Sequence, residues 1–571
     1  MTGLAAEMSG ELGSERRIEG WPNLVEVARL AQGHFNEICD PHHGHMAYVG
    51  GCIAMETPVF VRSLWDWVEA ASYGLPGRIA TRRLTGDSTG AEVEAGQRQL
   101  TLGSFNSLDG LAHSTYAKGW SEDTHVVLWE QARVLMTLMS WFAESQDERL
   151  LTFVRGMVAA LRNMSRAENG QRVFEDRYWR QEQVFGDVGP VVLVEPLMKY
   201  WEATGDGEAL DLCEGIVNWV MAPETGFVDE ECRFSGWLRG LAAALASVTR
   251  YAAATADDGL LDRCRRMLDT AIGLTAAFGA TPDTEPCCTN MELTTAALCQ
   301  ARAGHSQYWD DVDRWFRNHT LECQFRDATR VKPGSVPGDP KPDDDTRDIL
   351  TRSIGGFSWA TGRERKVAGA ALMLCCGGNA MWTMGKLVAN AAVREGDTTT
   401  VNLHFSVDTP AARITNWEPF EGRVEVVPRV GGTVRIRKPA YAGAVTATVN
   451  GEVAAPRPQG DYLVFEGTRA DQPIALTYDL QERLTEETTL ETPGPDGEER
   501  AWAYGPKRDP VVRERIEARW RGNTVLAIDY DETSEHPAEH RLYLDRMERY
   551  EMGEGREDVE RFFLPDEVYD W

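Results

Sequence analysis

Two pairs of adjacent cysteines are the residues best suited to chemistry in this sequence. Cys375-Cys376 precedes Gly377-Gly378, and an upstream pair lies in the segment Thr284-Glu285-Pro286-Cys287-Cys288. Each pair stands at a turn that leads into a helical pattern, and side chains displayed at such turns often carry function. Two segments of this kind can bring thiol and carboxylate groups to one metal ion.

Zinc takes four ligands from cysteine, histidine and carboxylate side chains. One oxygen and three sulfurs are offered by four residues: Glu285, Cys287, Cys375 and Cys376. Glu285 and Cys287 flank a proline, where the backbone is extended or turned, so their side chains can face the same way. A metal-bound thiolate can also attack the anomeric carbon of a sugar. The alternative is a set of buried or redox-active thiols without a metal.

Histidines and acidic residues in loops are further candidates for contact with a metal or a substrate. The segment Asp40–His45 contains His43 and His45, which could bind a metal, face a substrate or simply form hydrogen bonds within a loop. Glu182 and Asp187 lie between predicted helices and could contact a substrate, although solvated loop charges are the simpler interpretation. The chain also has 18 tryptophans, which suit either a sugar-binding cleft or a core.

The charge balance limits the partners of the protein. Among 571 residues, 89 are acidic and 59 are basic, which gives a formal net charge of −30. Such a charge disfavours nucleic acid and anionic membranes as partners. No basic segment followed by an apolar one is found near Met1, and no apolar run is long enough to span a bilayer. We therefore expect a cytoplasmic protein, and the odd number of cysteines, 11, gives no sign of a disulfide framework.

Apolar residues recur at helical spacing from Trp21 to about Asn390, for example in Val126–Ala143 and Leu238–Ala256. Helices that alternate with loops predict a toroid of helical hairpins, with a solenoid as the alternative. Gly74–Gln99 is rich in glycine and polar residues, and we expect it to be a loop. Residues 1–390 would form this helical toroid, which contains both cysteine pairs and would be the catalytic domain.

Alternating patterns replace the helical ones after about residue 391. Thr398–Phe405 and Arg423–Val430 read as strands, and Asn450-Gly451 is a strong hairpin turn. Residues 391–485 therefore predict an antiparallel β-sandwich. Residues 486–571 are highly charged, and we expect a C-terminal extension that packs on the other domains.

The sequence resembles glycoside hydrolase family 127, the β-L-arabinofuranosidase family. The likeness includes Glu285-x-Cys287 and Cys375-Cys376, in the family's order, and five other segments: Ser63–Tyr73, Leu128-Trp129, Glu195–Asp206, Ile436–Tyr441 and Val449–Gly451. The resemblance implies an (α/α)6 helical toroid followed by an antiparallel β-sandwich, a multidomain α+β architecture. It also implies zinc bound by the four residues named above, with Cys375 as the nucleophile of a retaining mechanism.

Two departures from the family concern the acid and the substrate contacts. The family's acid/base glutamate precedes its Glu-x-Cys motif, but Thr270–Thr284 contains no glutamate, so the acid is either Asp283 or a residue of another loop. The family's substrate-binding histidines are also missing from the helices. Candidates for contact with the substrate are His43, His45, Trp129, Glu182 and Asp187.

These features predict a zinc-dependent glycoside hydrolase that acts on a glycoside or short oligosaccharide, such as a β-L-arabinofuranoside or a related sugar. The protein could form a homodimer. One alternative is another carbohydrate-active enzyme on a helical toroid, a lyase or an epimerase. The other is a non-catalytic sugar-binding protein with structural zinc, and the missing acid glutamate is the main support for this alternative.

Overall fold

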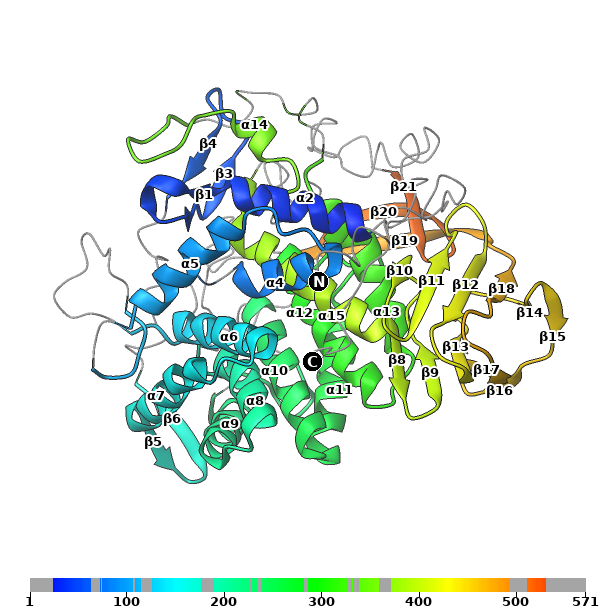
Figure 1. Cartoon of the computed structure of the whole chain (residues 1–571), viewed down its shortest axis with the longest axis horizontal. Coiled ribbons are helices and arrows are strands. Elements are labelled where there is room, and N and C mark those ends of the chain that lie inside the picture. The colour runs from blue at the N-terminus through cyan, green and yellow to red at the C-terminus, as the bar shows by residue number, and fades with distance from the viewer. Residues whose placement is uncertain are drawn as a thin grey trace.

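The computed structural model describes residues 24–62, 72, 74–105, 108–113, 126–175, 189–225, 227–233, 238–281, 286–326, 328, 331, 334, 338–358, 371–491 and 511–529. Helices make up most of the described residues up to Ala391, and strands make up most of those that follow. In Figure 1 the helices form one large body, and the yellow strands lie at its side. The expected helical toroid followed by a β-sandwich is confirmed.

Six of the described helices form the inner ring of the toroid. They contact one another in chain order, and the last contacts the first, which closes the ring. These helices are α4 (Leu75–Thr85), α6 (Leu128–Ser145), α8 (Val194–Thr204), α10 (Leu238–Thr255), α12 (Pro286–Arg302) and α15 (Leu374–Ala391). Consecutive residues of α10 from Leu238 to Ala252 are buried, because this helix has neighbours on every side.

The outer helices alternate with the inner ones along the chain, beginning with α2 (Leu24–Glu37). The others are α5 (Ala91–Gly103), α7 (Glu148–Met164), α9 (Gly207–Val220), α11 (Asp258–Gly273) and α13 (Tyr308–Trp315). Asp147, Asp206 and Asp257 cap α7, α9 and α11, each by accepting a hydrogen bond from a backbone N–H of the first turn. Each cap stands where the preceding inner helix has just ended, so the sequence marks three successive hairpins in the same way.

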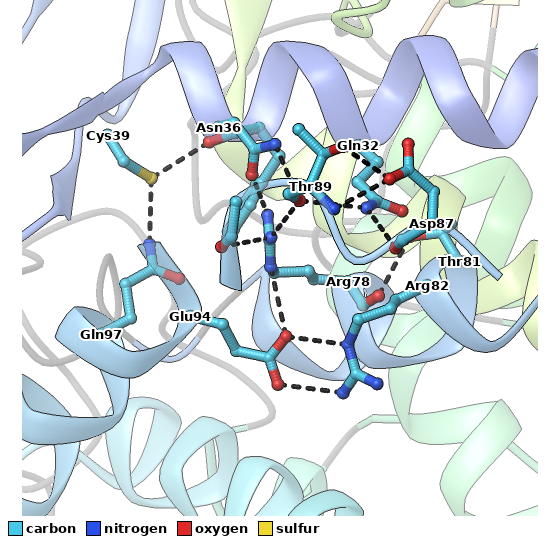
Figure 2. Close-up of polar contacts among 12 residues, drawn as sticks. Gln32, Asn36, Cys39, Arg78, Thr81, Arg82, Asp87, Thr89, Glu94 and Gln97 are labelled. Atoms are coloured by element: carbon cyan, nitrogen blue, oxygen red, sulfur yellow. Dashed lines mark hydrogen bonds and ion pairs between the residues drawn. The ribbon is translucent and has the colours of Figure 1, made fainter. Parts of the chain in front are cut away.

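The expectation of a loop at Gly74–Gln99 is wrong, because this segment contains α4 and most of α5. Its polar side chains lie between helices, as Figure 2 shows. The buried Arg78 guanidinium donates hydrogen bonds to Asn36 and to the carbonyl oxygen of Thr89 (3.0 Å), and it forms an ion pair with Glu94 (3.4 Å). Composition alone cannot distinguish such a buried polar network from a solvated loop.

Two sheets follow the toroid. One has the strand order β10-β11-β12-β18-β14-β15 and the other β16-β17-β13-β9-β8. Their bounds are β8 (Ala392–Glu395), β9 (Thr398–Val401), β10 (Val407–Asp408), β11 (Ala412–Asn416), β12 (Arg423–Pro428), β13 (Gly432–Arg437), β14 (Val445–Val449), β15 (Glu452–Ala454), β16 (Arg457–Gln459), β17 (Tyr462–Thr468) and β18 (Ile474–Tyr478). All neighbouring pairs are antiparallel except β9 and β13, which are parallel.

The predicted hairpin turn at Asn450-Gly451 joins β14 to β15. Both residues have positive φ angles, 53° and 81°, which the tight hairpin turn requires and which this residue pair tolerates.

A third sheet joins β19 (Glu482–Glu491), β20 (Val511–Arg521) and β21 (Thr524–Asp529). Asn523, in the turn before β21, donates to Asp313 of the toroid (2.7 Å), and the Asn523 carbonyl oxygen accepts from Asn318 (2.7 Å). The Asn523 backbone N–H donates to Glu418 of the sandwich. This turn therefore ties the three parts together, whereas the domain boundaries at 390 and 485 stay predictions.

Acid should destabilise the protein through His404, which lies between β9 and β10. The ring is 3% exposed, and neither nitrogen has a hydrogen-bond partner among the described residues. Burial lowers the pKa of His404 to about 3, and Arg437 acts in the same direction. Below about pH 6.5 the unfolded chain binds a proton at this histidine, whereas the folded protein does not. The free energy of unfolding therefore falls as the pH drops from 6.5 towards 3.

We expect His404→Leu to reduce this loss by about 1.4 kcal/mol for each pH unit below about 6.5. Urea unfolding at about pH 7.5 and about pH 4.5 would measure it. An equal loss of stability in the variant and the wild-type protein would contradict the prediction.

Candidate active site

The first turns of α12 and α15 carry the cysteine pairs. Cys287 and Cys288 follow Pro286 at the start of α12, and Cys375 and Cys376 follow Leu374 at the start of α15. The two helices are neighbours in the inner ring. The sequence predicted that these segments meet, and the structure brings them together.

A small sheet fixes the start of α15. It joins β4 (Val59–Val61), β3 (Gly50–Cys52) and β7 (Ala371–Met373), and the Leu374 backbone N–H donates to the carbonyl oxygen of Val49 (2.8 Å). On the other side, α4 approaches α15 closely at Gly77, where a Cβ atom would lie 2.6 Å from the carbonyl oxygen of Gly378. The backbone that presents Cys375 is thus held by a strand and by a close helix contact.

Three sulfur atoms form a compact group. The Sγ atoms of Cys288, Cys375 and Cys376 all lie within 4.8 Å of one another. Cys288 Sγ is 3.4 Å from Cys376 Sγ, which is 3.9 Å from Cys375 Sγ. Sulfurs at two corners of a tetrahedral zinc site lie about 3.8 Å apart, because each Zn–S bond is about 2.3 Å long. The group therefore has the spacing that a soft divalent ion requires.

Cys288 occupies the place in this group that the sequence analysis gave to Cys287. Adjacent residues of a helix point about 100° apart, so only one of the two can face α15 directly. The Cys287 thiol is fully buried, and its hydrogen-bonding neighbours are Cys323 and Cys376. The sequence analysis named only Cys287 of this adjacent pair, and the helix phase that decides between the two could not be read from the sequence.

The three thiols have different acidities. Hydrogen bonds from Cys375 and Cys376 hold the pKa of Cys288 well below its usual range, and the positive charge of Arg239 acts in the same direction. Donating to Cys288 raises the pKa of Cys375, and burial raises that of Cys376. Cys288 is therefore the thiol of the group that ionises most readily, and a divalent cation would favour ionisation of the other two.

Arg239, in the first turn of α10, links the sulfur group to α6, since its charge acts on Cys288. The Arg239 guanidinium carbon lies 5.2 Å from the centre of the Trp129 ring, and Arg133 lies 4.9 Å from it on the same cation–π criterion. Arg239 also approaches Glu292 of α12, with 3.6 Å between Nη1 and Oε1. Trp129, a predicted substrate contact, is thus linked to the cysteines through Arg239, which the sequence analysis did not single out.

The histidine segment forms its own cluster. His43 Nδ1 lies 2.7 Å from Asp40 Oδ2, and Arg62 pairs with the same carboxylate. His45 has a φ angle of 64°, and its buried Nδ1 has no partner among the described residues. Neither His43 nor His45 is part of the sulfur group.

Four predicted site residues lie outside the described residues: Glu182, Asp187, Asp283 and Glu285. The acid and the oxygen ligand therefore stay predictions, as do the substrate contacts.

Solved structures share this fold. A GH127 β-L-arabinofuranosidase from Geobacillus stearothermophilus is 14% identical over 90% of this chain and 86% of its own, with a TM-score of 0.55. The GH127 β-arabinofuranosidase BT3674 is 13% identical over 90% of this chain and 83% of its own, with a TM-score of 0.57. A third structure, described as a glycoside hydrolase, is 14% identical over 80% and 77%, with a TM-score of 0.52.

The resemblance to family 127 is thereby confirmed at the level of the fold. Neither a protein-family model nor a curated protein matches the sequence. None of the described helices is long and apolar enough to cross a membrane.

Proposed function

We propose that the protein is a retaining glycoside hydrolase whose nucleophile is the thiolate of Cys375. The observation that carries this proposal is the group of three sulfurs at the start of two inner helices of the toroid. The structures of the same fold, which are named as arabinofuranosidases, support a β-L-arabinofuranoside or a related sugar as the substrate.

A zinc ion fits the residues of the group. Cys288, Cys375 and Cys376 would hold it with their sulfurs, and Glu285 is the candidate for an oxygen ligand. Three thiolates in a buried site need a compensating positive charge, and soft thiolates select zinc. When bound, the ion would keep the cysteines ionised at neutral pH.

The reaction follows from the roles of the chain's own residues. Cys375 Sγ bonds to the anomeric carbon while the bond to the leaving oxygen breaks, and that oxygen takes a proton from a carboxylic acid, for which Asp283 is the candidate. Water then attacks the same carbon and the C–S bond breaks, while the carboxylate takes the proton from the water. Two displacements at one carbon retain its configuration.

Hydrolysis of aryl furanosides and pyranosides tests the proposal. We expect Cys375→Ala to lower kcat by at least about a thousandfold, because the covalent route is lost. Cys299→Ser is the control. Cys299 lies on α12 but outside the sulfur group, so this variant should keep full turnover. A slow substrate should add the mass of one glycosyl unit to the peptide that contains Cys375.

Full turnover by Cys375→Ala would refute the role of that residue. A product that absorbs in the ultraviolet would instead indicate a lyase.

A further inference from the structure

A cavity of about 720 Å³ lies between the toroid and the β-sandwich. The ends of α12 and α15 form one wall, and strands β8, β9 and β13 with the turn from β16 to β17 form the other. Sites for small molecules usually measure about 300–1,000 Å³ and often lie between domains. The size and place of this cavity are those of a ligand site.

The cavity is separate from the cysteines. Cys288 lies in the first turn of α12 and Arg302 ends that helix, while Cys376 lies in the first turn of α15 and Asn390 is next to its end. Fourteen residues separate the members of each pair, which corresponds to about 21 Å along a helix. A molecule in the cavity therefore cannot also contact the sulfur group unless it is much longer than a trisaccharide.

The walls offer hydrogen-bond donors and acceptors in balance. Two cationic and two anionic side chains line the cavity, together with amides, and the main ones are Arg302, Arg435, Glu395, Asp461, Asn402 and Gln459. With no excess of one charge, the lining does not select a charged ligand.

Arg435 is the residue that points most directly to a ligand. Its guanidinium carbon lies 4.6 Å from the centre of the Tyr462 ring, and its buried Nε has no hydrogen-bond partner among the described residues. That Nε is shielded from the cavity, but the two Nη atoms are not, and they have no hydrogen-bond or ion-pair partner among the described residues, so they can donate to an acceptor in the cavity. The Tyr462 hydroxyl donates to Asn402 (2.7 Å), which fixes the ring beneath Arg435.

We propose that this cavity binds a neutral oligosaccharide at a non-catalytic site. Sugar hydroxyls both donate and accept, so they can satisfy amide, carboxylate and guanidinium groups together. The proposal goes beyond the hydrolase activity, since it needs no chemistry at the cysteines. It holds or fails independently of that activity when binding alone is measured.

Calorimetry with the Cys375→Ala protein tests the site without turnover. The probes are the neutral trisaccharides arabinotriose, xylotriose and mannotriose, with trigalacturonate and the glucosamine trimer as charged counterparts. We expect at least one neutral trisaccharide to bind, and Arg435→Met to weaken that binding at least about tenfold. Gln459→Ala, at an exposed position, should weaken it severalfold without affecting the fold.

Arg457→Met is the matched control. Arg457 lies on β16 of the same sheet, is 57% exposed, and does not line the cavity. Its substitution should leave the affinity unchanged. The proposal is overturned if no neutral trisaccharide binds in a way that depends on Arg435 and Gln459, or if only a charged trimer does so.

Discussion

Cys288→Ala is expected to remove the metal from the purified protein, whereas Cys287→Ala is expected to leave it bound. The Cys288 sulfur belongs to the group of three with Cys375 and Cys376, and the Cys287 sulfur does not. Loss of one of three sulfur ligands should reduce the metal content from about one ion per chain to nearly none. Elemental analysis of both variants after dialysis would measure it.

The two variants are matched controls for each other. Both side chains are fully buried, in adjacent positions of one helix, so their removal creates similar cavities. The opposite result, with the metal lost only from Cys287→Ala, would support the ligand set predicted from the sequence. It would mean that the first turn of α12 is rotated by about 100° from its position here.

Asp313→Ala should be the most destabilising change at the junction of the three parts. Asp313 accepts from Arg317 at 2.8 and 3.2 Å and from Asn523 at 2.7 Å. Arg317 has no exposed surface, and its pKa is raised through the negative charge of Asp313, against the effect of burial. Removing the carboxylate takes away the ion-pair partner that the buried Arg317 contacts directly, although Glu418 still acts on its charge, and the loss of one partner of a buried pair typically costs about 3–5 kcal/mol. Urea unfolding would measure the loss.

Glu466→Ala is the control for this prediction. Glu466 pairs with Arg457 at 3.4 Å, with both side chains more than half exposed, so the loss should not exceed about 1 kcal/mol. The double variant Asp313→Leu with Arg317→Met should recover much of the stability, because an apolar pair replaces a buried ion pair at little cost. Similar losses in Asp313→Ala and Glu466→Ala would contradict the assigned role of this ion pair.

The main architecture could be predicted because it follows from regular patterns. The apolar residues of segments such as Val126–Ala143 recur at helical spacing because the helix packs in the interior, and Asn450-Gly451 specifies a turn through its own backbone preferences. The parallel pairing of β9 with β13 was not predicted, since pairing partners far apart in sequence leave no periodic signal.

Long-range contacts explain what the sequence did not reveal about the site. Gly74–Gln99 looked like a loop because Arg78 is polar, and its burial depends on Asn36 and Glu94 in other helices. The choice between Cys287 and Cys288 depends on helix phase, and Arg239 became a candidate only through its contact with Trp129. Such residues are identified by their neighbours, which a single sequence does not show.

The capping aspartates stand on the rim of the ring that is remote from the sulfurs. Asp147, Asp206 and Asp257 follow the C-terminal ends of inner helices, whereas the cysteines stand at the N-terminal starts of α12 and α15. The helix caps and the sulfur group therefore lie at opposite ends of the inner helices. The connection at each of these aspartates is only two residues long and already capped, so substitutions that alter stability there can be made far from the cysteines.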